Sequence, residues 1–370
     1  SAATFLQFEQ THSAWPFPFM RQAWMAILFW EQNSEQNAQQ STSNKCTSQK
    51  GSSQKELTTQ QPDRQYVWFL KFPLDEQAKL NLAARDDFLR QLLAALQHYL
   101  NCGETDPIKK FQSLEADMKD NPYGFTPNQE RMANFHARVH QYLKLPPSRF
   151  YRPAVEYLTG SNGFEQWSFV GYQGLADVAA RLDEEADNMP AETISNESIV
   201  AQSIQELPDQ PLTALLNCLE NHTLSSLLTR KILQRVQEEL KDEPRTATRN
   251  LNTKPALLAS LIRASGQSTD KNTQYQLLQS IFQSDHCKNI EVIAAIAARC
   301  WLALKDPALL ALFLEALAKN DHGQHAFNAI ISDLLFIPGM REVILQQFRS
   351  TSRSSRLAQA IGAFFKQVAE

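Results

Sequence analysis

The sequence lacks the cysteine patterns that mark redox, zinc-binding or disulfide-stapled proteins. It has five cysteines, an odd number, and no two of them stand two residues apart. This spacing excludes the Cys-x-x-Cys motifs of thioredoxin-like proteins and of zinc ribbons. Reduced thiols in a reducing compartment are the simplest interpretation, so we expect a cytoplasmic protein.

The sequence also lacks an apolar run long enough to cross a membrane. Its most apolar early stretch, 23–30, is far shorter than the roughly 20 residues that a transmembrane helix needs. We therefore expect no membrane partner. The chain starts at Ser1 without a methionine, which indicates a trimmed or processed N-terminus, so the sequence leaves open an N-terminal address upstream.

No charge of one sign is in excess. Lys and Arg total 36, Asp and Glu total 40, and the formal net charge is −4. Bulk charge therefore does not draw the chain to nucleic acid or to an anionic membrane. The nucleophile elbow G-x-S-x-G and the Lys-Ser/Thr of a P-loop are both missing. No motif predicts a cofactor or a metal.

The first part of the chain predicts a β-hairpin. Residues 66–72 are aromatic and β-branched and end at Pro73, as expected of a strand. Residues 20–30 are apolar on every face, which fits either a buried strand or a buried helix, and we favour a strand that pairs 23–30 with 66–72. Between them, residues 31–65 are rich in Gln, Ser, Asn and Thr and are predicted to be a disordered loop. Both hairpin faces are apolar, so either the domain core or a partner protein must cover them.

Helices and one further strand follow the hairpin. An amphipathic helix is predicted from Asp75 to Leu100, and a second from an N-cap at Thr126 to residue 142 or 143. Residues 167–172 resemble a strand, and Gly174 opens another helix that ends at Leu182.

After residue 190 the pattern is helical throughout, with short polar breaks. The predicted helices are 195–206, 212–221, 223–241, 254–265, 272–283, 288–304, 307–319, 322–335, 338–348 and 353–368. The sequence thus predicts a mostly α protein. It has a small α+β domain over 1–190, with the polar loop 31–65, and an all-α helical-repeat domain of the HEAT (solenoid) type over 191–370.

One candidate polar site lies in the first domain. His136 and His140 stand four residues apart on a predicted helix, where both imidazoles share a face and could meet a metal. The glutamate of a metalloprotease motif is absent, because residue 137 is alanine, and Glu130 is poorly spaced as a third ligand. Tyr172 and Gln173 complete the set. Structural or surface histidines explain the same spacing, and no metal is predicted.

A candidate anion site combines two segments. Gly171 and Gly174 lie between the predicted strand and helix, where backbone N–H groups could cradle a phosphate, although a tight turn explains them equally. Arg349, Arg353 and Arg356 form a basic segment near the C-terminus that could contact phosphate or an acidic partner. A solvated helix face is the alternative interpretation of these arginines.

Several motifs together resemble an uncharacterised gammaproteobacterial family, a domain of unknown function with a helical-repeat C-terminal half. They are KFPLDEQ at 71–77, NPYGF at 121–125 with Pro127 and Glu130, MANFHA at 132–137, and GYQGLAD at 171–177. The resemblance covers most of the chain and implies a cytoplasmic bacterial protein, but it brings no activity. The family carries a further N-terminal segment, and the polar stretch 31–65 is longer than the family needs.

The function that we expect from these patterns is a non-enzymatic, protein-binding adaptor or scaffold that uses the helical array. Fold class does not determine function, so two alternatives remain open. The first is an enzyme with a small-molecule site near His136 and Tyr172. The second is nucleic-acid binding through the basic C-terminal face.

Overall fold

The computed structural model describes residues 2–16, 18, 21–30, 65–103, 107–161, 163–186, 194–241 and 254–369. The chain divides into two compact units, residues 1–127 and 128–370. The boundary predicted at residue 190 lies inside the second unit, because residues on both sides of it, such as Val178 and Ile199, share one hydrophobic core. The predicted loop 31–65 lies outside the described residues, except for Gln65.

The first unit contains the predicted hairpin. β1 (Gln22–Trp30) pairs antiparallel with β2 (Gln65–Pro73), with Ala23 opposite Phe72. One face of this sheet is buried against helix α3 (Leu82–Asn101), where the Phe72 and Phe88 rings lie 5.4 Å apart. On the sheet the Trp24 ring also meets Phe125, at 4.5 Å. The core of the unit therefore covers the face that carries Phe72, whereas Trp24 on the other face is half-buried.

Helices complete the first unit. They are α1 (Ala2–Glu9), α3 (Leu82–Asn101) and α4 (Pro107–Met118), and α4 packs along α3. Asn81 caps α3 by accepting a hydrogen bond from the Ala84 N–H at 3.2 Å. The predicted start at Asp75 is wrong, because its carboxylate accepts from the Gln77 and Lys79 N–H groups in a turn.

The second unit is helical throughout its described residues, as predicted for the region after residue 190. Its first helices are α5 (Gln129–Tyr142), α6 (Tyr151–Leu158) and α7 (Gly171–Ala180). They are followed by α8 (Asn196–Glu206), α9 (Asp209–Leu219), α10 (Ser226–Glu239), α11 (Lys254–Ser265), α12 (Lys271–Phe282), α13 (Ile290–Arg299), α14 (Pro307–Leu317), α15 (Gly323–Phe336), α16 (Arg341–Phe348) and α17 (Ser355–Ala369). The ten helices predicted from the sequence correspond to α8–α17, with bounds that differ by a few residues.

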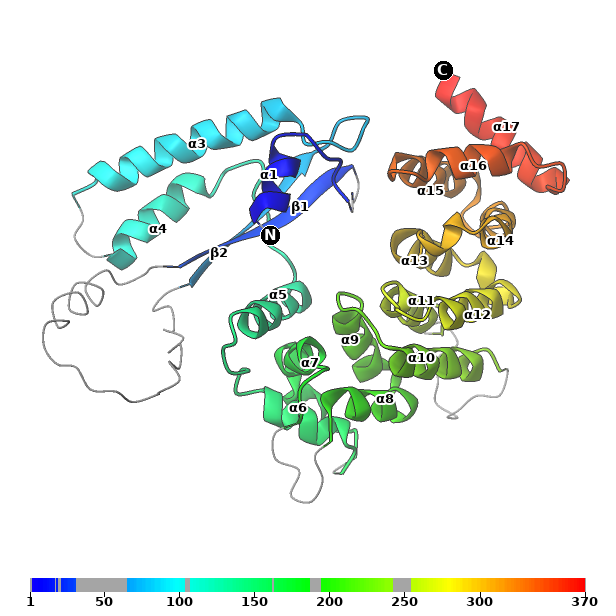
Figure 1. Ribbon diagram of the computed structural model, residues 1–370, viewed down its shortest axis with the longest axis horizontal. Coiled ribbons are helices and arrows are strands. Elements are labelled where there is room, and N and C mark those ends of the chain that lie inside the picture. Colours follow the sequence, from blue (N-terminus) through cyan, green and yellow to red (C-terminus); the bar gives the residue numbers. More distant parts are fainter. Residues whose placement is uncertain are drawn as a thin grey trace, which may run out of the picture. The chain divides into compact units, whose positions relative to one another are not determined.

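These helices pack in two rows, because each helix contacts the one two positions further along the chain (Figure 1). The odd row is α5, α7, α9, α11, α13, α15 and α17, and the even row is α6, α8, α10, α12, α14 and α16. A single hydrophobic core runs between the rows from Ala133 to Phe364. Each amphipathic helix buries its apolar stripe in this shared core.

Polar caps set many of the helix starts. The capping side chains of α8, α10, α12, α13 and α14 are Ser195, Ser225, Asp270, Asn289 and Asp306. Each accepts a hydrogen bond from a backbone N–H of the first turn, which would otherwise lack a partner. Pro307 occupies the first position of α14, where a missing N–H costs nothing.

Two local predictions are wrong. Residues 167–172 form no strand: Trp167–Phe169 is a 3-10 helix, and α7 begins at Gly171. A strand needs a neighbour to satisfy its backbone groups, whereas here the Val170 N–H donates to the Trp167 carbonyl at 3.0 Å. The N-cap of α5 is Asn128 rather than Thr126, and its side chain accepts from the Arg131 N–H at 3.0 Å.

Candidate functional site

The odd row of the second unit gathers six polar residues along one line, which we call the polar strip. They come from α5, α7, α9, α11 and α13 and are Glu130, Tyr172, Asn217, Glu220, Arg263 and Arg299. None of the six is fully buried. Each is joined to another member by a hydrogen bond or an ion pair.

The first part of the strip centres on the Glu130 carboxylate. Asn217 Nδ2 donates to Glu130 Oε2 at 3.2 Å, and the Tyr172 hydroxyl is hydrogen-bonded to the same carboxylate. The pKa of Tyr172 is raised, first by burial and then by the charge and hydrogen bond of Glu130. Tyr172 thus stays a neutral hydrogen-bond donor at physiological pH.

The second part of the strip is a carboxylate held by two arginines. Glu220 is the C-cap of α9, and its oxygens lie 3.2 Å from Arg263 Nε and 2.7 Å from Arg299 Nη2. A carboxylate at a helix C-terminus faces the negative end of the helix dipole. The two guanidinium groups offset that cost, and they themselves lie in the last turns of α11 and α13, where a cation is favoured.

Asn217 connects the two parts. Its Oδ1 accepts from Arg263 Nη2 at 3.4 Å, while its Nδ2 donates to Glu130. The ends of α11 and α13, which carry the two arginines, pack closely. A Cβ at Gly266, just after α11, would lie only 2.7 Å from the Arg299 carbonyl oxygen at the end of α13. The strip therefore ties successive helices of the odd row together.

The outer side of the strip offers hydrogen-bond donors. The side chains of Arg263 and Arg299 are 32% and 36% exposed. Among the residues that the structure describes, Nη1 of Arg263 and both Nε and Nη1 of Arg299 have no hydrogen-bond partner. Such groups suit the binding of carboxylates or carbonyls on a partner.

The predicted histidines lie on another side of α5. Their ring centroids are 4.0 Å apart, and His140 Nδ1 lies 3.1 Å from the Pro146 carbonyl oxygen. The pKa of His136 is lowered, chiefly by burial and then by His140. No third ligand joins them: within the described part of the chain, no group of three or more His, Cys, Asp or Glu side chains could hold a metal ion.

Gln173 belongs to a buried network rather than to the strip. Its Nε2 donates to Asp177 Oδ1 at 3.2 Å, and the other Asp177 oxygen accepts from the N–H and Oγ of Ser148. Arg181 lies 3.6 Å from the same Oδ1 and donates to the Leu145 carbonyl. This network fixes the connection between α5 and α6. The five predicted residues are thus divided: Glu130 meets Tyr172 in the strip, His136 meets His140 on another side of α5, and Gln173 joins the Asp177 network.

The residues of the candidate anion site have structural roles: the two glycines serve helix packing and a turn, and the arginines bind carbonyls at helix ends. A Cβ at Gly174 would lie 2.5 Å from the Phe150 carbonyl oxygen, so glycine lets α7 approach α6 closely. Gly171 has a φ of +65°, a conformation that glycine adopts without strain. Neither glycine contacts the arginine segment in the structure.

The arginines mostly cap helices. Arg353 Nη1 donates to the Phe348 and Ser350 carbonyls, at 2.9 and 2.7 Å, and Arg356 Nε donates to the Ala318 carbonyl at 2.9 Å. Arg349 is the exposed C-cap of α16. These bonds satisfy carbonyls at the ends of α14 and α16.

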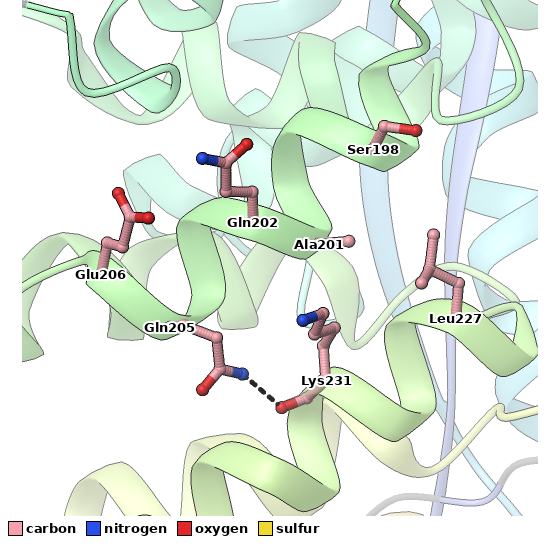
Figure 2. Close-up of a pocket in the computed structure, with 7 residues that line it drawn as sticks. All are labelled: Ser198, Ala201, Gln202, Gln205, Glu206, Leu227 and Lys231. Atoms are coloured by element: carbon pink, nitrogen blue, oxygen red, sulfur yellow. Dashed lines mark hydrogen bonds between the residues drawn. The ribbon is translucent and has the colours of Figure 1, made fainter.

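An open hollow of about 440 Å³ lies elsewhere, between α8 and α10 (Figure 2). Its lining consists of Ser198, Ala201, Gln202, Gln205, Glu206, Leu227 and Lys231. Gln205 Nε2 donates to the Lys231 backbone carbonyl at 2.7 Å, which ties the two helices at its base. No residue predicted from the sequence lines this hollow.

The sequence analysis missed Asn217, Glu220, Arg263 and Arg299. The arginines stand near the ends of predicted helices, which is an ordinary capping position. The one sequence signal is Glu220, a carboxylate at a helix C-terminus, which needs a compensating cation.

Comparison with known proteins identifies the family. The model of a family described as a protein of unknown function, DUF3549, matches residues 1–40 and 56–365. The chain belongs to this family. The unmatched residues 41–55 fall within the polar stretch, in agreement with the expectation that this stretch is longer than the family needs. No curated protein and no solved structure matches the chain.

A half-buried histidine beside the odd row should make this DUF3549 protein less stable in acid. The Nε2 atom of His222 is buried and has no hydrogen-bond partner, and the pKa of this histidine is lowered to about 4, first by burial and then by Arg138. Between pH 6.5 and 4 the proton binds His222 mainly in the unfolded chain, so the free energy of unfolding decreases as the pH falls through this range. We expect His222 to account for a loss of about 2 kcal/mol between pH 7.5 and pH 5.

Urea unfolding of the wild type and of His222→Gln at both pH values measures this loss. The variant should lack that part of the pH dependence. His325→Gln, at an exposed position on α15, is the control and should keep the wild-type dependence. Equal pH dependence in the wild type and His222→Gln would contradict the prediction.

Proposed function

We propose that the protein is a non-enzymatic adaptor or scaffold that binds another protein through its helical array, and that this array is a HEAT-like solenoid. The observation that carries the proposal is the packing of α5–α17 in two rows around one continuous core. Such an arrangement presents each row as an extended surface built from many short helices.

The odd row is the better candidate for the binding surface. Its polar strip spans five helices and leaves arginine donors accessible beside half-buried carboxylates. The same helices also carry exposed apolar and small side chains, including Met132 on α5 and Ala294 and Ala298 on α13. A row that presents both polar and apolar side chains matches the general composition of protein interfaces.

We also propose that the protein works in the cytoplasm of a bacterium, as the family resemblance implies. The four cysteines that the structure describes are Cys102, Cys218, Cys287 and Cys300, and all are free thiols. Burial raises the pKa of Cys218 and of Cys300 to about 12, so both thiols are unreactive in the folded chain. Within the described residues, no helix combines the length and apolar character needed to span a membrane.

The test compares two variants that each add three carboxylates to one row. Met132→Glu, Ala294→Glu and Ala298→Glu change the odd row, and Gln202→Glu, Gln237→Glu and Gln276→Glu change the even row. All six positions are exposed, so both variants should fold, which circular dichroism checks. Tagged chains are then used for affinity capture from native lysate with nuclease present, followed by mass spectrometry.

We expect a stoichiometric protein partner that the wild type and the even-row variant retain and the odd-row variant loses. A partner lost by both variants, or by neither, would argue against binding through the odd row. If the wild type captures no protein once nuclease is added, the adaptor hypothesis fails.

A further inference from the structure

Helix α3 in the first unit carries a second apolar face that is not part of its core. The buried face includes Ala84, Phe88 and Ala95. On another side, Leu82, Leu89, Leu93 and Leu100 are 44%, 40%, 60% and 70% exposed. Four exposed leucines on one helix form a contiguous apolar patch of the kind that marks an interface.

The spacing of these leucines follows the seam of a coiled coil. With Asp86 and the half-buried Leu96, the residues 82, 86, 89, 93, 96 and 100 are separated alternately by four and three positions. Side chains at this spacing lie on one face of the helix and pack as knobs into the holes of a facing helix. The seam, defined as these six residues, therefore fits another helix rather than a sheet or an irregular loop.

We propose that this seam is a homodimer interface, in which α3 packs antiparallel against α3 of a second copy of the chain. The order of the spacings, 4-3-4-3-4, is the same in both directions along the helix. An antiparallel pair thus brings Leu82 opposite Leu100 of the second copy and Leu89 opposite Leu93 of the second copy. A two-fold interface requires such a self-complementary patch.

The charges on α3 favour the antiparallel arrangement. In a parallel pair, Asp86 would face Asp86 of the second copy inside the seam, and like charges repel. In the antiparallel pair it faces Leu96 of the second copy, and the two Asp86 carboxylates are about 15 Å apart along the axis. Arg90, near the two-fold axis, is compensated on its own helix by Asp87 at 3.4 Å.

Small side chains beside the seam allow close approach. Ala83 and Ala94 are exposed next to the leucines. The seam is about 28 Å long and roughly 10 Å wide, so the contact is smaller than that of a permanent dimer. We therefore expect a reversible dimer with a dissociation constant on the order of 10 µM.

Sedimentation velocity of the full chain from about 1 to 200 µM tests the proposal. The wild type should shift from monomer to dimer over this range. Leu93→Glu places one carboxylate per copy in the seam, and we expect the dissociation constant to rise by at least about a hundredfold. Asp86→Leu removes the one charged seam position and should tighten the dimer by about tenfold.

Leu312→Glu is the matched control, because Leu312 is also an exposed leucine, at 40%, but lies on α14. It should dimerise as the wild type does, and circular dichroism of Leu93→Glu at low concentration should show native helicity. A wild type that stays monomeric at 200 µM would overturn the proposal. So would a Leu93→Glu variant that dimerises normally, or a Leu312→Glu variant that loses the dimer equally.

Discussion

Replacing Arg235 by alanine is expected to reduce the free energy of unfolding by about 3–5 kcal/mol. This arginine is buried on α10, and its Nη1 donates to three carbonyls at the end of α8, those of Ile204, Gln205 and Leu207. Its Nε donates to Glu239 at 2.8 Å, and that carboxylate is also buried. Without the guanidinium, the buried Glu239 carboxylate loses this ion pair and three carbonyls lose a hydrogen-bond donor.

Chemical denaturation of Arg235→Ala and of the wild type measures the loss. Arg356→Ala is the matched control, because this exposed arginine contributes one bond to the Ala318 carbonyl, and its loss should cost less than about 1 kcal/mol. The double variant Arg235→Met with Glu239→Met should recover part of the loss, because it also removes the buried carboxylate. Recovery should be incomplete, because the carbonyls at the end of α8 still lack the hydrogen-bond donor that Arg235 supplied. Equal stability of Arg235→Ala and Arg356→Ala would contradict this account.

Substituting Gly174 by alanine is expected to destabilise the second unit by about 2 kcal/mol or more. The new Cβ would lie 2.5 Å from the Phe150 carbonyl oxygen and 2.9 Å from the Ala154 Cβ. The first of these is a backbone atom, so α6 and α7 must move apart. The overpacking outweighs the roughly 1 kcal/mol that alanine contributes to a helix through its propensity.

Thermal or urea unfolding of Gly174→Ala gives the size of this effect. Gly362→Ala is the control within α17, where a Cβ would meet nothing within 4 Å. It should leave stability unchanged or raise it by up to about 1 kcal/mol. If both variants gain stability, the close approach of α6 to α7 is not a constraint on folding.

The two constraints explain why Gly171 and Gly174 have different roles within one motif. Gly171 adopts a positive φ at the start of α7, and Gly174 permits close helix packing three residues later. The sequence motif alone also matches a phosphate-binding turn. Only the tertiary structure shows that Phe150 and Ala154 occupy the space beside Gly174, where a phosphate-binding turn would have to be open to its ligand.

Local patterns were enough to predict much of the fold. The hairpin of β1 and β2 and the ten helices α8–α17 follow from apolar periodicity, caps and proline or glycine breaks, which act within a few residues of the chain. The same local rules failed at residues 167–172, where an aromatic, β-branched stretch is a 3-10 turn and a helix. β-propensity describes a fit to a neighbouring strand, and no strand of the described residues pairs with this segment.

The polar strip could be predicted only in part. Glu130 and Tyr172 were selected from the sequence and do meet, but the other members of the strip, Asn217, Glu220, Arg263 and Arg299, come from segments far along the chain. Proximity across such separations depends on which helices stack, and helical periodicity does not specify that.

For α3 the sequence determined the helix and its buried face, because Ala84 and Phe88 recur at helical spacing and Asn81 provides the cap. Its leucines at 82, 89, 93 and 100 have the same apolar character as core residues, and only the tertiary structure decided which of them stay exposed. The physical reason is that periodicity records which side chains avoid water, whereas burial depends on whether another element packs against that face. Helix α3 and the helices α8–α17 were therefore determined by local sequence. The polar strip and the exposed leucine face were decided by packing between segments distant in the chain.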